Sequence, residues 1–317
     1  MTVLTIAVSS RTLFHIEDGN NVFETQGQAA FDEYMRSKED VPLRPGAAFP
    51  LVRKLLGLNS SQGAFKRDKV EVVLLSRNSP DAGLRVMNSI KHYGLDIERA
   101  VFSAGTDRFR YARALGADLF LSANATDVLS ALNQGLAAAT LIPRERQDGV
   151  GEVDQTVRIA FDGDSVLFGD EADECYRQEG LDEFRRSEVA NANVPLGEGP
   201  LKRFLQALTQ LQAKLEGDDR LRVALVTARG MPAHERPIKT LRHWGLHVDE
   251  AVFAAGTSKG PLLSAFGADI FFDDARRNIA SADEHDISSG HVPYGNQDGP
   301  TILATESSAE APLPRAA

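Results

Sequence analysis

The chain has 317 residues with 45 acidic and 35 basic side chains, which gives a formal net charge of −10. Hydrophobic residues make up 42% and charged residues 25%, proportions that exclude disorder as the main state. The acidic balance argues against non-specific binding to nucleic acids or anionic membranes, because both need a basic surface. A chain of this length predicts two domains.

Cysteine content and apolar segments narrow the class of protein further. The only cysteine, Cys175, excludes an internal disulfide and a metal site built from cysteines. The N-terminal segment MTVLTIAVSS has no basic residues before its apolar run, so it is predicted to be a strand rather than a signal peptide. No run approaches the roughly 18 apolar residues of a membrane-spanning helix. We therefore expect a cytoplasmic protein.

The predicted elements alternate between apolar strands and amphipathic helices, in an order that occurs twice. The first series is the strand VLTIAV (3–8), a largely helical insert, the strand VEVVLLS (70–76), the helix AGLRVMNSIKHYG (82–94), the short strand AVFSAG (100–105), another helix, and the strands DLFLSA (118–123) and ATLIP (139–143). The second series is TVRIAF (156–161), an insert with apolar residues at helical spacing, LRVALVT (221–227), ERPIKTLRHWG (235–245), AVFAAG (251–256), a helix, DIFFDD (269–274) and GHVPYG (290–295).

This double series is an internal repeat. Residues 88–105 and 239–256 are identical at eight of 18 positions with a constant offset of 151, where composition predicts about one chance match. The same offset aligns GADLFLSAN with GADIFFDDA, and an offset of 153 aligns IAVSSR with IAFDGD further upstream. The period is too long for a solenoid, so it indicates one domain used twice.

Continuous apolar strands that alternate with helices predict a parallel sheet covered on both faces, the doubly wound α/β fold. We expect two such domains, packed pseudo-symmetrically. A polar segment, RERQDGVGE (144–152), marks their boundary, and the last residues have the composition of a disordered tail. The predicted boundaries are 1–147 for the first domain, 148–304 for the second, 169–216 for a helical cap inserted in the second, and 305–317 for the tail.

Polar side chains follow four strands of the second series. Since ligands of such sheets bind beyond the carboxyl ends of the strands, we expect these side chains to converge. Several carboxylates at one edge would repel each other unless a cation such as Mg²⁺ lies among them. One aspartate is then free to attack phosphorus, and another is placed to protonate the leaving oxygen. The side chains are Asp162, Asp164, Thr227, Lys259, Asp273 and Asp274.

Each of these residues alone has an ordinary structural explanation, such as a turn, a helix cap or a surface lysine. Their common order, each after its own strand, favours the functional interpretation. The motifs FDGDSVLF, LVTARG, SKGPLL and FFDDARRN resemble those of the haloacid dehalogenase superfamily of phosphotransferases. Together with LTIAVSSRTLF, RPGAAFPLV, NSIKHYGLDIERAVFSAG, GLDEF and HVPYG, they resemble the cytosolic 5′-nucleotidase I family over residues 4 to about 296.

That resemblance implies Mg²⁺-dependent hydrolysis of nucleoside 5′-monophosphates, with AMP a common substrate and adenine nucleotides as effectors of some members. It implies two haloacid dehalogenase-like domains, the second of them catalytic. By position, Asp162 resembles the nucleophile, and Asp164 the general acid and base whose main-chain carbonyl meets the metal. Thr227 and Lys259 resemble the phosphate-binding pair. Asp273 and Asp274 both resemble metal ligands, and the sequence leaves open which one contacts the ion.

The first copy lacks every acidic group that this chemistry needs, so it is predicted to be non-catalytic. Hydroxyl and cationic groups remain, and they suggest an anion pocket of Ser9, Ser10, Arg11, Ser76 and Arg108. Two interpretations stay open: a half that serves only as a packing partner, or one that binds a nucleotide phosphate without a metal. In the alignment, Asp162 matches Ser9, Asp164 matches Arg11, Thr227 matches Ser76, Lys259 matches Arg108, and Asp273-Asp274 matches Ser122-Ala123.

We therefore expect a magnesium-dependent 5′-nucleotidase. One alternative is a phosphatase of another small phosphorylated metabolite, because the four motifs recognise phosphate rather than a base. The other is a nucleotide-sensing protein with incidental hydrolysis. Base preference and oligomeric state, including a homo-oligomer, stay open.

Overall fold

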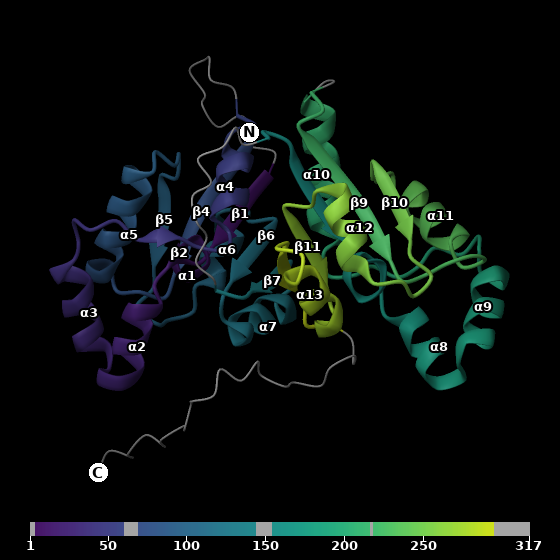
Figure 1. The fold of residues 1–317 in the computed structure, drawn as a ribbon, viewed down its shortest axis with the longest axis horizontal. Coiled ribbons are helices and arrows are strands. Elements are labelled where there is room, and N and C mark those ends of the chain that lie inside the picture. Colours follow the sequence, from purple (N-terminus) through teal and green to yellow (C-terminus); the bar gives the residue numbers. More distant parts are fainter. Residues whose placement is uncertain (1–3, 60–68, 144–153, 216–217, 295–317) are drawn as a thin grey trace, which may run out of the picture.

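The computed structural model describes residues 4–59, 69–143, 154–215 and 218–294 (Figure 1). The predicted boundary at 144–152 and the predicted tail at 305–317 lie outside these ranges. The fold is α/β, with a large and mostly parallel sheet, as the alternating pattern predicts. Among the described helices, none combines the length and apolar character needed to cross a membrane.

One sheet of ten strands runs through both halves of the chain, in the order β10-β9-β8-β11-β12-β7-β6-β1-β4-β5. Its first-half strands are β1 (Leu4–Val8), β4 (Val70–Ser76), β5 (Arg99–Phe102), β6 (Leu119–Ser122) and β7 (Ala138–Leu141). Its second-half strands are β8 (Val157–Phe161), β9 (Leu221–Thr227), β10 (Glu250–Phe253), β11 (Ile270–Asp273) and β12 (Ser288–His291). A separate small sheet pairs β2 (Phe14–His15) with β3 (Arg44–Pro45).

The strand order of one half mirrors that of the other. Pairing is parallel within each half, and the halves meet where β12 pairs antiparallel with β7, Gly290 lying opposite Leu141. The equivalent last strands of the two series are therefore neighbours at the centre of the sheet. The two halves of the chain thus share one continuous sheet.

Helices cover both faces of the sheet. Those of the first half are α1 (Ser10–Leu13), α2 (Glu17–Gln26), α3 (Gln28–Ser37), α4 (Phe49–Leu56), α5 (Pro80–His92), α6 (Phe109–Ala114) and α7 (Ala125–Asn133). Those of the second half are the π-helical turn η1 (Gly163–Leu167), α8 (Glu171–Glu179), α9 (Leu181–Ala190), α10 (Lys202–Leu215), α11 (Glu235–Trp244), α12 (Lys259–Phe266) and α13 (Arg276–Asp283).

Local sequence signals explain where several helices begin and end. The Ser79 hydroxyl accepts a hydrogen bond from Ala82 N at 3.1 Å and so caps α5, which starts at Pro80. At the other end of the equivalent helix α11, Gly245 takes the left-handed conformation, with φ of 66°, that glycine adopts without strain. The helix boundaries near residues 82–94 and 235–245 thus agree with the predictions.

The core is continuous on one face of the sheet and divided on the other. On the continuous face, alternate strand residues such as Ile6 and Ile159 pack with helices α4, α5 and α10 in a single cluster that spans both halves. The opposite strand residues form two smaller clusters, one around Phe120 under α6 and α7, the other around Phe271 under α12 and α13. Burying apolar surface on a shared face holds the two halves together.

Polar contacts that hold the backbone recur at equivalent positions. Ser89 Oγ accepts a hydrogen bond from Leu43 N at 3.0 Å, and Thr240 Oγ1 accepts one from Leu196 N at the same distance. In each half, a backbone N–H of the first strand donates to the aspartate just before the neighbouring strand. Thr5 N of β1 donates to Asp118, which precedes β6, and Arg158 N of β8 donates to Asp269, which precedes β11, each at 2.8 Å.

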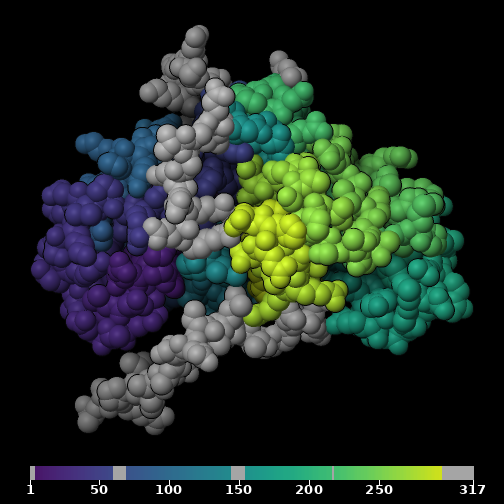
Figure 2. All heavy atoms as spheres, in the orientation of Figure 1, coloured from purple at the N-terminus to yellow at the C-terminus, as the bar shows by residue number. Residues whose placement is uncertain are grey.

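The inserts of the two halves occupy corresponding places. Each contains a helical hairpin, α2–α3 in the first half and α8–α9 in the second, joined by a glycine with positive φ (Gly27 at 82° and Gly180 at 83°). The two hairpins lie at opposite ends of the molecule, as the ribbon and the space-filling view both show (Figures 1 and 2).

Candidate active site

The candidate site lies where β8, β9 and β11 end side by side. Strand β8 lies between the other two, so its carboxyl end is flanked on both sides. Asp162 directly follows β8, Thr227 is the last residue of β9, and Asp273 is the last residue of β11. Lys259 is the first residue of α12. The structure thus brings these four predicted residues to one edge of the sheet.

Lys259 lies between two of the predicted carboxylates. Its Nζ is 2.7 Å from Asp162 Oδ2 and 2.7 Å from Asp273 Oδ2. The ammonium is almost fully buried, with 2% of the residue exposed. Burial alone would lower the pKa of Lys259, but the two carboxylates raise it, so the side chain stays charged. The lysine therefore offsets part of the negative charge at this edge.

The two adjacent aspartates at the end of β11 differ in their hydrogen bonds. Asp273 accepts bonds from Lys259, from Ala275 N at 2.8 Å and from Asn278 Nδ2 at 3.0 and 3.1 Å. Asp274 is 5% exposed, and its Oδ2 is buried without a hydrogen-bond partner among the described residues. A buried carboxylate oxygen without a partner is costly, so it identifies a place where a cation would be stabilised.

Asp162, Asp273 and Asp274 form a cluster with ligand oxygens within 4.8 Å of one another. Burial raises the pKa of Asp162 well above its ordinary value, although Lys259 opposes the shift. Burial, followed by the charges of Asp162 and Asp273, raises the pKa of Asp274 to about 9. Three buried carboxylates with one cationic partner fit a hard divalent cation, which prefers oxygen ligands.

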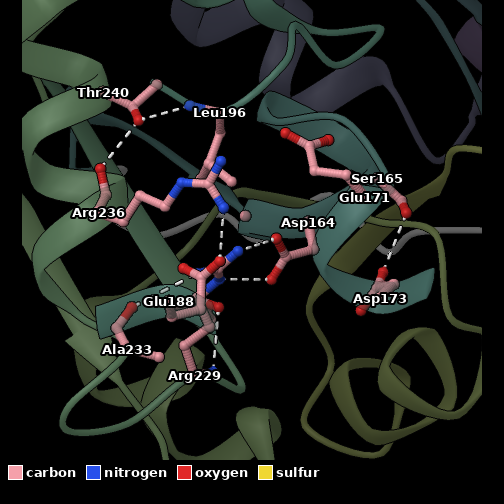
Figure 3. A network of polar contacts seen from close by, with 12 residues as sticks. Asp164, Ser165, Glu171, Asp173, Glu188, Leu196, Arg229, Ala233, Arg236 and Thr240 are labelled. Atoms are coloured by element: carbon pink, nitrogen blue, oxygen red, sulfur yellow. Dashed lines mark hydrogen bonds and ion pairs between the residues drawn. The ribbon is translucent and has the colours of Figure 1, made fainter. Parts of the chain in front are cut away.

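Asp164 belongs to a different network from the other aspartates (Figure 3). Its carboxylate receives two hydrogen bonds from Arg229, Nε to Oδ2 at 2.8 Å and Nη2 to Oδ1 at 2.7 Å. Arg229 also pairs with Glu188 on α9, and Glu188 in turn receives Arg236 Nη1 at 2.7 Å. Asp164 therefore follows Asp162 by two residues in the sequence, but its side chain is hydrogen-bonded to a buried arginine rather than to the cluster.

The Arg229 network links the candidate general acid to the helical hairpin. Arg229 and Glu188 are 4% and 3% exposed. Burial alone would lower the pKa of Arg229, but Asp164 and Glu188 together raise it, so the guanidinium is charged. A second contact, from Ser165 Oγ to Asp173 of α8 at 3.0 Å, also joins η1 to the hairpin (Figure 3). The position of the hairpin is therefore coupled to the loop that carries Asp164.

Thr227 lies against the glycine between the two aspartates of the DGD motif. A Cβ built on Gly163 would be 3.3 Å from Thr227 Oγ1, a close approach that favours glycine there. The hydroxyl also accepts a hydrogen bond from Arg229 N at 3.2 Å and is 1% exposed. Thr227 thus lies beside the DGD turn, and its phosphate-binding role stays a prediction.

Sequence reasoning missed several residues of this site. Arg229 lies within the LVTARG motif but was not singled out, and its spacing of two residues from Thr227 on the same strand end is a signal that could have found it. Glu188 gives no such signal, because a glutamate on an amphipathic helix is usually solvated. His291 Nε2 is 2.9 Å from the main-chain oxygen of Asp274, next to the end of β11.

The predicted anion pocket of the first half is a cavity of about 320 Å³ with a different lining from the prediction. Ser9, Ser10, Arg11 and Arg108 line it. Ser76 does not, because it is fully buried and shares a hydrogen bond of 3.0 Å with the Ser10 hydroxyl.

The arginines of this cavity are paired. Arg11 donates to Glu17 at 2.8 and 2.6 Å, and Arg108 pairs with Asp127. Both guanidinium groups therefore have a carboxylate partner, and neither of the two interpretations of the first half is settled by this.

Comparisons with known proteins agree with the geometry. The sequence profile of the 5′-nucleotidase family matches residues 1–299. Human cytosolic 5′-nucleotidase 1B is 38% identical over 291 residues, which cover 88% of this chain and 47% of the human protein. The chain thus spans about half the length of this curated relative. No solved structure gives a significant match. The chain therefore belongs to the 5′-nucleotidase family, and the identity to the human protein supports the predicted cytosolic 5′-nucleotidase I group.

Proposed function

We propose that this protein is a Mg²⁺-dependent 5′-nucleotidase that hydrolyses nucleoside 5′-monophosphates through a phosphate ester of Asp162. The observation that carries the proposal is the buried cluster of Asp162, Asp273 and Asp274 at one edge of the sheet, where Lys259 pairs with the first two. Membership in the 5′-nucleotidase family supports the substrate class.

Asp162, Asp274 and the main-chain carbonyl of Asp164 would hold the Mg²⁺ ion. Asp273 already has four hydrogen bonds from Lys259, Ala275 and Asn278, so it is better suited to orienting its neighbours than to binding the ion. Asp274 has a buried oxygen without a partner, which favours it as the direct ligand. When bound, Mg²⁺ supplies positive charge that offsets the phosphate and the carboxylates.

The chain's own residues then perform two transfers. Asp162 attacks phosphorus while the bond to the 5′ oxygen breaks, and Asp164 donates a proton to that oxygen as the nucleoside leaves. Asp164 next takes a proton from water, the water oxygen attacks the phosphorus of the aspartyl phosphate, and the released products are Asp162 and inorganic phosphate. Lys259 and Thr227 hold the phosphate oxygens in both steps.

Asp164 is paired with Arg229 as a carboxylate, so it must leave this arginine and take up a proton before it can protonate the leaving oxygen. In the structure the Asp164 carboxylate is held by two hydrogen bonds from this arginine. We propose that the hairpin α8–α9 is the cap, and that Glu188 on α9 holds Arg229 in place while Asp164 exchanges this pair for the leaving oxygen. A cap of this kind also excludes water from the phosphate.

We also propose that the chain arose by duplication of a haloacid dehalogenase-like domain. Mirrored strand order, matching glycines at 27 and 180, and the equivalent hydrogen bonds of Ser89 and Thr240 support this proposal. The name of the human relative supports a cytosolic location.

A substrate panel tests the proposed function. Phosphate release is measured from AMP, other nucleoside monophosphates and non-nucleotide phosphomonoesters, with Mg²⁺ and with EDTA. We expect Mg²⁺-dependent turnover with preference for nucleoside monophosphates, AMP among them. Equal or better turnover of sugar phosphates would contradict the nucleotide assignment, and turnover in EDTA would contradict the metal requirement.

A further inference from the structure

The first half contains a cavity that the proposed hydrolysis does not use. It lies beyond the ends of β1 and β6, and helices α2 and α3 form its outer wall. Its volume of about 320 Å³ falls within the range of small-molecule sites. The two ends of this cavity differ in chemistry.

The end next to the sheet presents hydrogen-bond donors. Ser9, Ser10, Arg11, Asn78 and Arg108 line it. Arg108 is 3% exposed, and its Nε has no hydrogen-bond partner among the described residues. Asn78 Nδ2 is likewise buried and without a partner in the part of the chain that the structure describes. Unsatisfied buried donors favour a ligand rich in acceptor atoms, such as a phosphate group.

The carboxylate partners of Arg11 and Arg108 accept hydrogen bonds from only some of the N–H groups of each guanidinium. Glu17 occupies Nε and Nη2 of Arg11, and Asp127 occupies Nη2 of Arg108, while a guanidinium carries five N–H groups. A third arginine, Arg77, also lines the cavity; 53% of its side chain is exposed, and its Nη1 is 3.7 Å from Asp127 Oδ1. Three arginines line the cavity and three carboxylates accompany them: Glu24 and Asp127 in the lining, and Glu17, which is paired with Arg11.

The end under the hairpin is aromatic. Phe23 and Phe31 line it, with ring centroids 6.2 Å apart and planes nearly perpendicular. Phe23 is 45% exposed, so its ring is accessible to a ligand in the cavity. Asn20 and Gln28 stand beside the rings and offer donors and acceptors for the edge of a heterocycle.

We propose that this cavity binds a nucleoside 5′-phosphate without hydrolysing it, with the phosphate at the arginines and the base against Phe23. Ser9, Arg11 and Ala123 stand where the second half has Asp162, Asp164 and Asp274, so neither a nucleophile nor a carboxylate metal site is present. Binding here does not depend on the proposed hydrolysis in the second half.

Hydrogen–deuterium exchange of the full chain tests the proposal, because it reports each half separately. The probe is the phosphonate analogue of AMP in which a methylene group replaces the bridging oxygen, added in EDTA. We expect protection of residues 17–37 on binding. Inorganic phosphate and adenosine, added separately, should each protect this segment less than the intact analogue. No protection of residues 17–37 by the analogue would overturn the proposal.

Two exposed side chains supply variants that should fold normally. Phe23→Ala combined with Arg77→Gln should weaken the protection of residues 17–37 at least about tenfold in ligand concentration. The matched control, Leu84→Ala with Arg110→Gln, changes exposed residues outside the cavity and should leave that protection unchanged.

A third variant separates this proposal from the proposed function. Asp162→Asn should retain the protection of residues 17–37 whether or not the second half hydrolyses nucleotides. Equal protection in the cavity variant and its control, or loss of protection in Asp162→Asn, would overturn the proposal.

Discussion

At the carboxyl edge of the second half, three buried aspartates form a cluster, and Lys259 pairs with two of them, whereas the equivalent edge of the first half presents serines and paired arginines around a cavity. The backbone frame is the same in both. Strand order, positive-φ glycines and the hydrogen bonds that hold each insert all correspond. The comparison teaches that the fold depends on the frame, while the chemistry depends on a few side chains at the strand ends.

The same contrast continues beneath the two hairpins. In the second half Arg236 donates to Glu188, which also binds Arg229. In the first half the equivalent arginine, Arg85, has its Nη1 3.8 Å from the sulfur of Met35, which stands in the place of the glutamate. The charged network that reaches Asp164 is therefore specific to the half with the aspartates.

The largest expected effect on the rate of hydrolysis comes from a pair of substitutions at equivalent positions, one in each half. Asp162→Asn should lower the rate of AMP hydrolysis by at least about a thousandfold, because the amide cannot act as nucleophile. Ser9→Ala, at the equivalent position, should change the rate by less than about threefold. Steady-state kinetics with circular dichroism as a check of folding measures both; similar losses in the two variants would show that the halves do not divide the chemistry in this way.

The second comparison concerns the buried ion pairs. Glu188→Gln should lower the free energy of unfolding by about 3 kcal/mol, since it leaves Arg229 and Arg236 buried with less compensating charge. Met35→Leu, at the equivalent place in the first half, should cost less than about 1.5 kcal/mol. Urea denaturation gives both values. An equal loss of unfolding free energy in the two variants would mean that the charged network contributes no more to stability than its apolar counterpart.

A third test uses pH in the absence of metal. The pKa of Asp274 is raised from 3.8 in the unfolded chain to about 9 in the folded one, first by burial and then by neighbouring carboxylates. Its protonated form therefore contributes stability that is complete below pH 3.8 and is lost as pH rises through about 9.

In EDTA the melting temperature should fall from about pH 5 to about pH 9, and Asp274→Asn should make the fall smaller. Mg²⁺ should restore stability at the higher pH in the wild type and less so in the variant. A fall of the same size in both proteins would show that Asp274 does not govern this dependence.

The smallest effects should be equal in the two halves. Ser89→Ala and Thr240→Val each remove a hydroxyl that accepts a backbone N–H at 3.0 Å. Each should cost about 1–2 kcal/mol of unfolding free energy, because a buried N–H loses its partner. Chemical denaturation measures the two costs, and a large difference between them would argue against a shared frame.

Much of the fold could be predicted because apolar strand runs and helix-ending glycines are local signals. The α/β class and the alternation of strands and helices are confirmed. The continuous sheet could not be predicted in the same way, since the pairing of Gly290 with Leu141 joins strands 149 residues apart and depends on packing between the halves.

The candidate site likewise has a part that the sequence predicts and a part that depends on packing. Asp162, Thr227, Lys259 and Asp273 could be placed together because parallel strands end at one edge. Their roles in catalysis stay predictions. Arg229, the partner of Asp164, could have been found from its place two residues after Thr227. Glu188, which pairs with Arg229, could not be foreseen, because it reaches the site only through the fold of an insert.

In the first half, the limits of sequence reasoning are equally specific. The hydroxyl of Ser76 was predicted to face the pocket, but packing buries it. Alternation along a strand indicates which face a residue takes, not whether a neighbouring loop covers its end. The aromatic wall formed by Phe23 and Phe31 could not be predicted either, because apolar residues at helical spacing usually belong to the core.

The central claim is that Asp162 carries the phosphate between two chemical steps. Acid-quenched samples taken during turnover of AMP, followed by peptide mapping with mass spectrometry, test it most directly. We predict that a phosphate is found on Asp162 in samples with Mg²⁺ and not in samples with EDTA. Rapid turnover with phosphate on another residue, or with Asp162→Asn as active as the wild type, would contradict the account.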